Sequence, residues 1–91
     1  MATFVVEVYV PPSKTGELEE VIRRLGDARE HAAPRAPDAR YVRSTFLPED
    51  EVCFHVFEAE TAAAVRDLGA GLALTFDRVL EACERGVGDA I

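Results

Sequence analysis

The sequence has few of the residues that build the best-known functional sites: two cysteines, two histidines, one methionine and no tryptophan among 91 residues. Cys53 and Cys83 form no spaced framework like that of disulfide-rich or zinc-binding domains, so we expect two free thiols. A Gly-x-Ser-x-Gly elbow and a glycine-rich dinucleotide fingerprint are both missing. The chain therefore contains no complete catalytic or cofactor motif.

Basic residues are also scarce, because 10 Lys and Arg stand against 17 Asp and Glu and give a net charge of −7. Such a chain repels phosphate backbones and anionic lipid surfaces, which argues against nucleic acid and membranes as partners. No apolar run approaches the roughly 18 residues of a membrane span, and the N-terminus lacks the basic start of a signal peptide. We expect a cytoplasmic protein.

The composition that is present, 48% hydrophobic and 30% charged, is that of a folded globular protein. We expect residues 1–91 to form a single domain, ordered from about residue 3 to about residue 85. A chain of this size buries only about 60–65% of the surface that its unfolded form exposes. Further burial between subunits would help, so we predict a homodimer.

Hydrophobic periodicity predicts six elements in the order β-α-β-β-α-β. They are a strand over Thr3–Val10, a helix from an N-cap at Thr15 to about Ala32, strands over Arg40–Leu47 and Glu51–Ala59, a helix capped by Thr61 and ended by glycines, and a strand over Leu74–Cys83. This order is the ferredoxin-like α+β plan, a four-stranded antiparallel sheet with both helices on one face. Right-handed crossovers give the strand order 4-1-3-2.

Alternation along each strand predicts which side chains face the helices. The face predicted to be buried is almost wholly apolar and contains Phe4, Val6, Val8, Val42, Phe46, Val52, Phe54, Val56 and Leu80. The open face is then half polar and contains Val5, Glu7, Tyr9, Tyr41, Arg43, Thr45, Cys53, His55, Phe57, Val79, Glu81 and Cys83. Its aromatic and apolar members predict that the dimer forms through this face.

The register of the central hairpin follows from the same alternation, since Phe46 needs an apolar partner such as Val52 if both are to reach the core. That pairing leaves a three-residue loop and sets Arg43 opposite His55. Matching the midpoints of the first and third strands then brings Glu7 near His55. The expected result is a row Arg43, His55, Glu7 across the open face.

This row has three interpretations. It is a set of cross-strand pairs inside a dimer interface, or it belongs to a small-molecule site, or His55 joins Cys53 as a weak pair of metal ligands. In the second case Arg43 holds an anionic group, Glu7 fixes the tautomer of His55, and the imidazole acts as base or ligand. The predicted ligand-binding residues are Glu7, Tyr9, Tyr41, Arg43 and His55.

The stretch "YVRSTFLPEDEVCFHVFEAETAAAVRDLG", followed by "LTFDRVLEA", resembles a family of small actinobacterial proteins that includes a nickel-binding member. The resemblance covers about residues 4–81 and implies a ferredoxin-like fold, a dimer and, in one branch, nickel held by histidines of the first strand and both helices. This chain has "VEVYV" and "TAAAVRDLGAG" at those places, so Cys53 alone matches a ligand position.

We therefore predict a small dimeric ligand-binding protein with a site on the open sheet face and no required cofactor. One alternative is an enzyme like the dimeric α+β barrel isomerases, cyclases and monooxygenases, which this chain resembles in topology only. The other alternative is a protein that binds nickel or another transition metal.

Overall fold

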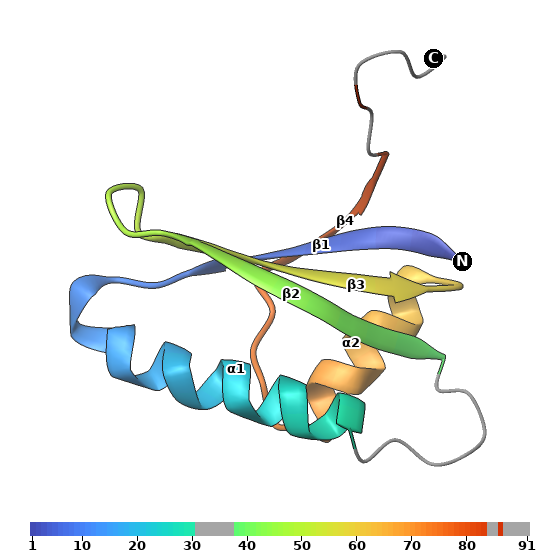
Figure 1. Ribbon diagram of the computed structural model, residues 1–91, viewed down its shortest axis with the longest axis horizontal. Helices are drawn as coiled ribbons and strands as arrows, with labels where there is room; N and C mark the ends of the chain where they lie inside the picture. The colour runs from blue at the N-terminus through green and yellow to red at the C-terminus, as the bar shows by residue number, and fades with distance from the viewer. Residues whose placement is uncertain (31–37, 84–85, 87–91) are drawn as a thin grey trace.

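Four strands and two α-helices follow the predicted order in the computed structural model, which describes residues 1–30, 38–83 and 86 (Figure 1). The elements are β1 (Ala2–Tyr9), the 3-10 turn η1 (Pro12–Lys14), α1 (Thr15–Glu30), β2 (Ala39–Leu47), β3 (Val52–Ala59), α2 (Ala62–Gly71) and β4 (Arg78–Ala82). All neighbouring strands are antiparallel, in the order β2-β3-β1-β4. Read from the other edge this is 4-1-3-2, so the predicted ferredoxin-like fold and strand order are confirmed.

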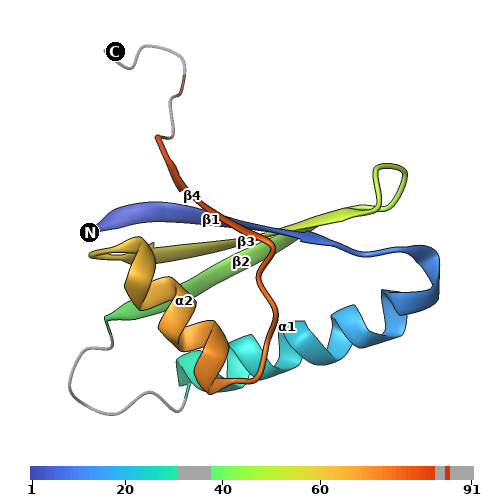
Figure 2. The same cartoon turned by 180° about the vertical axis from the view of Figure 1, so that it is seen from behind.

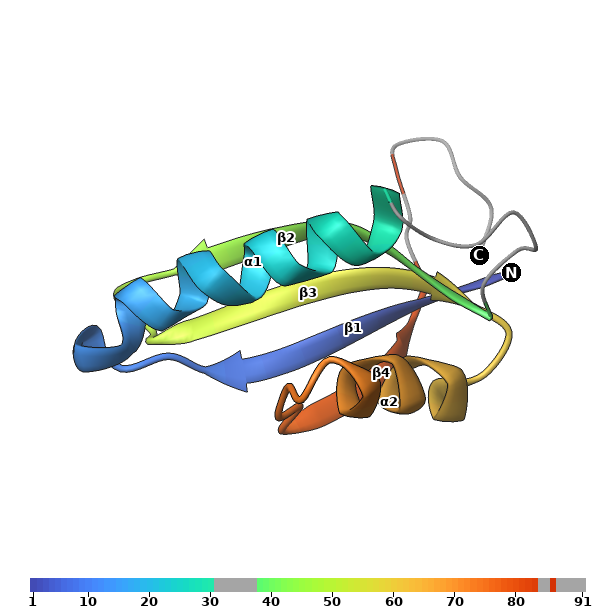
Figure 3. The same ribbon diagram turned by 90° about the horizontal axis from the view of Figure 1, so that it is seen from below.

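Both helices cover the same face of the sheet, as Figures 2 and 3 show from behind and from below. α1 contacts β2, while α2 contacts β4, β3 and β2. The larger core cluster between the layers consists of Phe4, Val6, Leu25, Ala39, Tyr41, Phe57, Ala59 and Val65. A smaller cluster of Val10, Leu18 and Cys53 lies under the start of α1. None of the described helices is long and apolar enough to cross a membrane.

The two predicted helix caps have different outcomes. Thr61 has extended backbone angles, and its Oγ1 accepts a hydrogen bond of 3.1 Å from the backbone N–H of Ala64, so this N-cap is confirmed. Thr15 is not an N-cap, because its hydroxyl instead donates to the carbonyl of Pro12 at 2.6 Å. The 3-10 turn η1 precedes α1 and already directs the chain into the helix.

The last strand is shorter than predicted, since β4 begins at Arg78 and not at Leu74. Residues 72–77 rise from the end of α2 to the sheet (Figure 2). Ala73 has a positive φ of 57°, which turns the chain away from α2. Phe76 lies so close to Gly69 that a Cβ there would sit 2.4 Å from the ring, so only glycine allows this approach. Packing against α2 therefore outweighs the strand pattern.

The predicted register of the hairpin is wrong by one residue. Leu47 pairs with Val52 and Phe46 with Cys53, and residues 48–51 form a four-residue turn. Glu51 closes this turn with φ of 55°, in the left-handed region. Because side chains alternate along a strand, one extra residue in the turn exchanges the two faces of β3.

An irregularity in β2 changes its faces as well. A β-bulge lies between Tyr41 and Arg43, so Tyr41 faces the helices opposite Phe57 while Arg43 faces outward opposite Val56. The predicted row Arg43, His55, Glu7 therefore does not form. The row that contains His55 faces the helices and consists of Ser44, His55, Val6 and Val79.

Several face assignments are corrected in consequence. Cys53, His55, Phe57 and Tyr41 are buried under the helices, whereas Val52, Phe54, Val56 and Leu80 belong to the open face. Glu81, predicted on the open face, shares the helix side with its partner Phe4. The open face thus carries the apolar row Val56, Val5, Leu80, flanked by Arg43 on β2.

Candidate functional site

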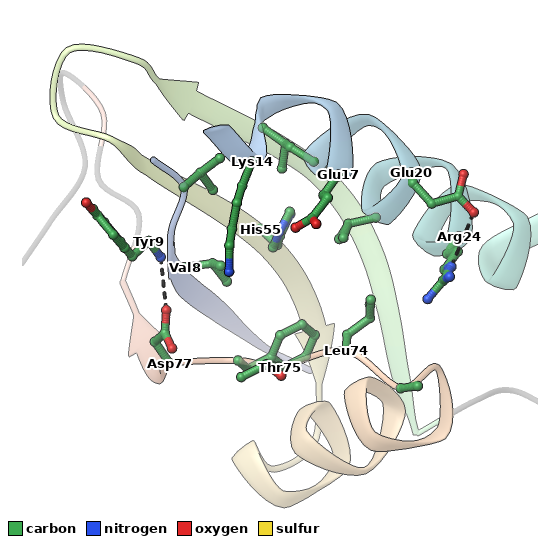
Figure 4. Close-up of a pocket in the computed structure, with 15 residues that line it drawn as sticks. Val8, Tyr9, Lys14, Glu17, Glu20, Arg24, His55, Leu74, Thr75 and Asp77 are labelled. Atoms are coloured by element: carbon green, nitrogen blue, oxygen red, sulfur yellow. Dashed lines mark hydrogen bonds and ion pairs between the residues drawn. The ribbon is translucent and has the colours of Figure 1, made fainter. Parts of the chain in front are cut away.

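A cleft of about 770 Å³ opens on the helix side of the sheet, between α1 and residues 73–77 (Figure 4). This volume lies within the roughly 300–1,000 Å³ typical of small-molecule sites. Val8 and His55 come from the sheet, Val21 and Leu18 from α1, and Phe76 from the segment before β4. The cleft thus has an apolar part around His55, formed by the sheet, by α1 and by the segment before β4.

His55 is the one polar side chain of the sheet that reaches the cleft within the described part of the chain. It is 1% exposed, and its Nδ1 lies 2.6 Å from the hydroxyl of Ser44. Its Nε2 has no hydrogen bond to any described residue. Every fully buried polar side-chain atom among those residues does have a partner, so Nε2 is not one of the fully buried atoms. Nε2 is therefore not sealed in the core but borders the cleft that His55 lines.

The Nδ1 side of the ring belongs to a short hydrogen-bonded chain. The Tyr41 hydroxyl lies 2.6 Å from Ser44 Oγ, which in turn contacts His55 Nδ1. The thiol of Cys53 lies 3.9 Å from the same ring nitrogen. Because β2 bulges after Tyr41, both Tyr41 and Ser44 face the helices and reach this position.

Burial sets the ionisation of both buried groups. It lowers the pKa of His55 from 6.5 to about 4, because the imidazolium would lose its hydration in this environment. Burial also raises the pKa of the Cys53 thiol. At neutral pH the site therefore offers a neutral imidazole and an un-ionised thiol, a combination suited to hydrogen bonding and not to nucleophilic attack.

Charged side chains form the rim of the cleft. Figure 4 shows Lys14, Glu17, Glu20 and Arg24 along one side, with Lys14 and Glu17 extending on either side of His55. Glu20 contacts Arg24 at 3.4 Å, and hydrogen bonding to Arg23 lowers its pKa. The opposite rim has Asp77, whose carboxylate accepts a 2.9 Å hydrogen bond from the backbone of Tyr9. Two cations and three carboxylates thus surround the opening.

The five predicted ligand-binding residues do not come together in one place. His55 and Tyr41 lie on the helix side, in the hydrogen-bonded chain with Ser44. Glu7 and Arg43 lie on the open face, where Glu7 approaches Arg78 at 3.7 Å. Tyr9 contributes its backbone to the cleft edge, but its side chain points away in Figure 4 and its hydroxyl donates to Glu51 at 2.8 Å.

The side chains of Cys53 and His55, predicted as weak candidate metal ligands, lie close together in the structure. Cys53 and His55 are neighbours in the core, with sulfur and Nδ1 3.9 Å apart. No group of three or more His, Cys, Asp or Glu side chains that could hold a metal ion occurs among residues 1–30, 38–83 and 86. Cys83 is exposed and directly follows the last residue of β4.

Sequence reasoning missed Ser44, Phe76 and Leu74 as members of this region. A signal for Phe76 was present, because Gly69 precedes it by seven residues in an alanine-rich helix and leaves room for a ring. No signal in the sequence places Ser44 beside His55, since that contact depends on the bulge after Tyr41.

Fold and site together define a ferredoxin-like α+β domain with a cleft on its helix side. The chain is similar in structure to the Streptomyces coelicolor A3(2) protein SCO4226, with a TM-score of 0.71 and 12% sequence identity over 93% of this chain and all of the other. At this identity the likeness shows the fold alone, and it agrees with the actinobacterial resemblance at that level. No known protein family and no curated protein matches the chain.

Proposed function

We propose that this protein binds a small molecule in the cleft between α1 and residues 73–77. The observation that carries the proposal is the position of His55, a nearly fully buried imidazole whose Nε2 borders a cleft of about 770 Å³ beside apolar side chains. A molecule that displaces water from the cleft has to replace the hydrogen bond that Nε2 can make to that water, so His55 offers a bound molecule a fixed polar contact. This site replaces the open-face site predicted from the sequence.

The binding site can be tested with 2-ethylnaphthalene, a flat apolar probe. We expect amide chemical shifts to change at Val8, Val21, Leu74 and Phe76 when the probe is added to labelled protein, since these residues line the cleft. Val21→Trp would fill the space and weaken binding by roughly tenfold or more, equivalent to about 1.4 kcal/mol. Ala63→Trp, on an exposed position of α2, is the matched control.

Shift changes confined to Val5, Phe54 and Leu80 would contradict this assignment, because those residues lie on the open face. The same result would place the ligand on the open face, beside Glu7 and Arg43. Nickel binding, which the family resemblance implies, is a weaker candidate, since Cys53 and His55 provide two donors and a stable site needs about two more.

We further propose that the binding protein is a homodimer joined through the open sheet face. Strands that are apolar on both faces are typical of sheets covered on both sides, and here the helices cover one side only. Val5, Phe54, Val56 and Leu80 lie on the uncovered side, where Leu80 is 40% exposed. A second copy brings the same apolar surface and satisfies the extra burial that so small a chain needs.

Leu80→Glu is expected to convert the dimer to a folded monomer, because it places two charges of one sign within a desolvated interface. Sedimentation velocity at micromolar concentration would measure the change, and circular dichroism would show that the fold persists. Ala63→Glu adds the same charge to an exposed position on the helix side and should leave the dimer intact. Monomeric wild-type protein at these concentrations would disprove the dimer.

A further inference from the structure

We infer that the cleft selects an uncharged, largely apolar ligand that presents a hydrogen-bond acceptor such as a ketone or ester carbonyl. This inference rests on the proposed function and names the class of ligand. The argument starts from the chain Tyr41, Ser44, His55, whose two hydrogen bonds can run in either of two directions. The direction decides whether His55 offers a donor or an acceptor to the cleft.

The Tyr41 hydroxyl determines the direction. Within the described residues its single hydrogen-bonding partner is Ser44 Oγ, so Tyr41 has no other acceptor there for its proton. A phenol is also a better donor than an aliphatic hydroxyl, because it is the stronger acid. Tyr41 therefore donates to Ser44 Oγ, and the Ser44 hydroxyl donates to His55 Nδ1.

An Nδ1 that accepts a hydrogen bond from the Ser44 hydroxyl carries no proton itself, so the ring proton of the neutral imidazole is on Nε2. The un-ionised thiol of Cys53, at 3.9 Å from Nδ1, fits the same assignment because it also has a proton to donate. Nε2–H then points to the cleft as a donor, held in place by strand β3 and by the chain behind it. A ligand needs an acceptor to complete this bond.

The surroundings favour a neutral acceptor over a carboxylate. His55 is uncharged at neutral pH, so it gives an anion one hydrogen bond and no counter-charge. The groups that face the opening are Lys14, Glu17, Glu20 and Arg24 on one rim and Asp77 on the other, which add to a net negative charge of one. An anion would lose its hydration against Val8, Val21 and Phe76 without adequate compensation.

Three probes of similar size test this inference on the full chain at neutral pH: 2-acetylnaphthalene, 2-ethylnaphthalene and 2-naphthoate. We expect the ketone to bind about threefold to tenfold more tightly than the hydrocarbon, as one neutral hydrogen bond provides. We expect the carboxylate to bind more weakly than the ketone. In His55→Phe the ketone should lose its advantage over the hydrocarbon, while both still bind.

Two further measurements keep the test independent of that variant. Long-range ¹⁵N–¹H spectra of the wild type should show His55 protonated at Nε2 and bare at Nδ1. Ser44→Ala removes the donor to Nδ1 and should reduce the ketone's advantage without changing the affinity for 2-ethylnaphthalene.

The outcomes separate the inference from the proposed function. A proton on Nδ1, or binding of 2-naphthoate or 2-ethylnaphthalene as tight as that of the ketone, overturns the inference and leaves the cleft as a binding site. If none of the three probes binds, the proposed function fails and the inference fails with it.

Discussion

Phe57→Asp is expected to abolish folding, whereas Phe54→Asp, three residues earlier on the same strand, is expected to leave the protein folded. Phe57 is fully buried, and its ring packs edge-on against Tyr41 and tilted against Phe76, with ring centroids 5.7 Å and 5.8 Å apart. Loss of a buried phenylalanine costs about 3–5 kcal/mol, and a buried unpaired carboxylate adds several more. That sum is comparable with the whole stability of a small domain, about 5–15 kcal/mol.

The Phe54 variant is a matched control, because the substitution and strand are the same and only the face of the sheet differs. Phe54 lies opposite Thr45 and Glu7 on the open face, where an aspartate remains hydrated in the monomer. Circular dichroism and thermal denaturation measure both variants. The register predicted from the sequence gives the opposite result, with Phe54 essential and Phe57 tolerant, so the reverse outcome would refute the hairpin described here.

The second large effect is a loss of stability as the pH falls, caused by His55. Its pKa is about 4 in the folded protein and 6.5 when unperturbed. Between these two pH values, His55 is protonated in the unfolded chain but neutral in the folded chain. Stability is therefore fully present above about pH 6.5 and declines as the pH falls toward about 4. The full difference of 2.5 pKa units corresponds to about 3 kcal/mol at 1.36 kcal/mol per unit.

Urea denaturation at about pH 7.5 and about pH 5 measures most of this effect, with an expected loss of about 2 kcal/mol. Glu20 also has a lowered pKa in the folded protein, but the stability that it contributes is lost below about pH 4.5, its ordinary pKa. That range lies outside the interval from about pH 7.5 to about pH 5. His55→Gln should have a much flatter pH dependence. His31→Gln removes the chain's other histidine and should retain the full pH dependence of stability. If the pH dependence disappears in His31→Gln, the assignment of the effect to His55 is wrong.

Local patterns were enough to predict the elements and their order. Alternating β-branched residues predicted β1, the spacing of Leu18, Val21 and Leu25 predicted α1, and Thr61 predicted the start of α2. These signals are local, because they depend on which residues follow one another within one or two turns. The ferredoxin-like order β2-β3-β1-β4 then followed from the handedness of the connections.

The candidate site could not be predicted in the same way, because it depends on two positions where the chain departs from regular geometry. One is the four-residue turn closed by Glu51, which exchanges the faces of β3 and buries His55. The other is the bulge after Tyr41, which brings Ser44 to His55. Val52, Phe54 and Val56 are more apolar than Cys53, His55 and Phe57, so hydrophobicity favoured the wrong face.

The sequence by itself thus determined the fold class, the strand order and the net charge of −7. Only the tertiary structure decided which face of β3 is buried, where β4 begins and what surrounds His55. The physical reason is that one residue added at a turn or bulge hardly changes the local secondary-structure preference of the chain. It nevertheless moves every following side chain of the strand to the opposite face of the sheet. The cost of burying His55 is offset by Ser44 and Tyr41, whose contacts arise only when the sheet is assembled.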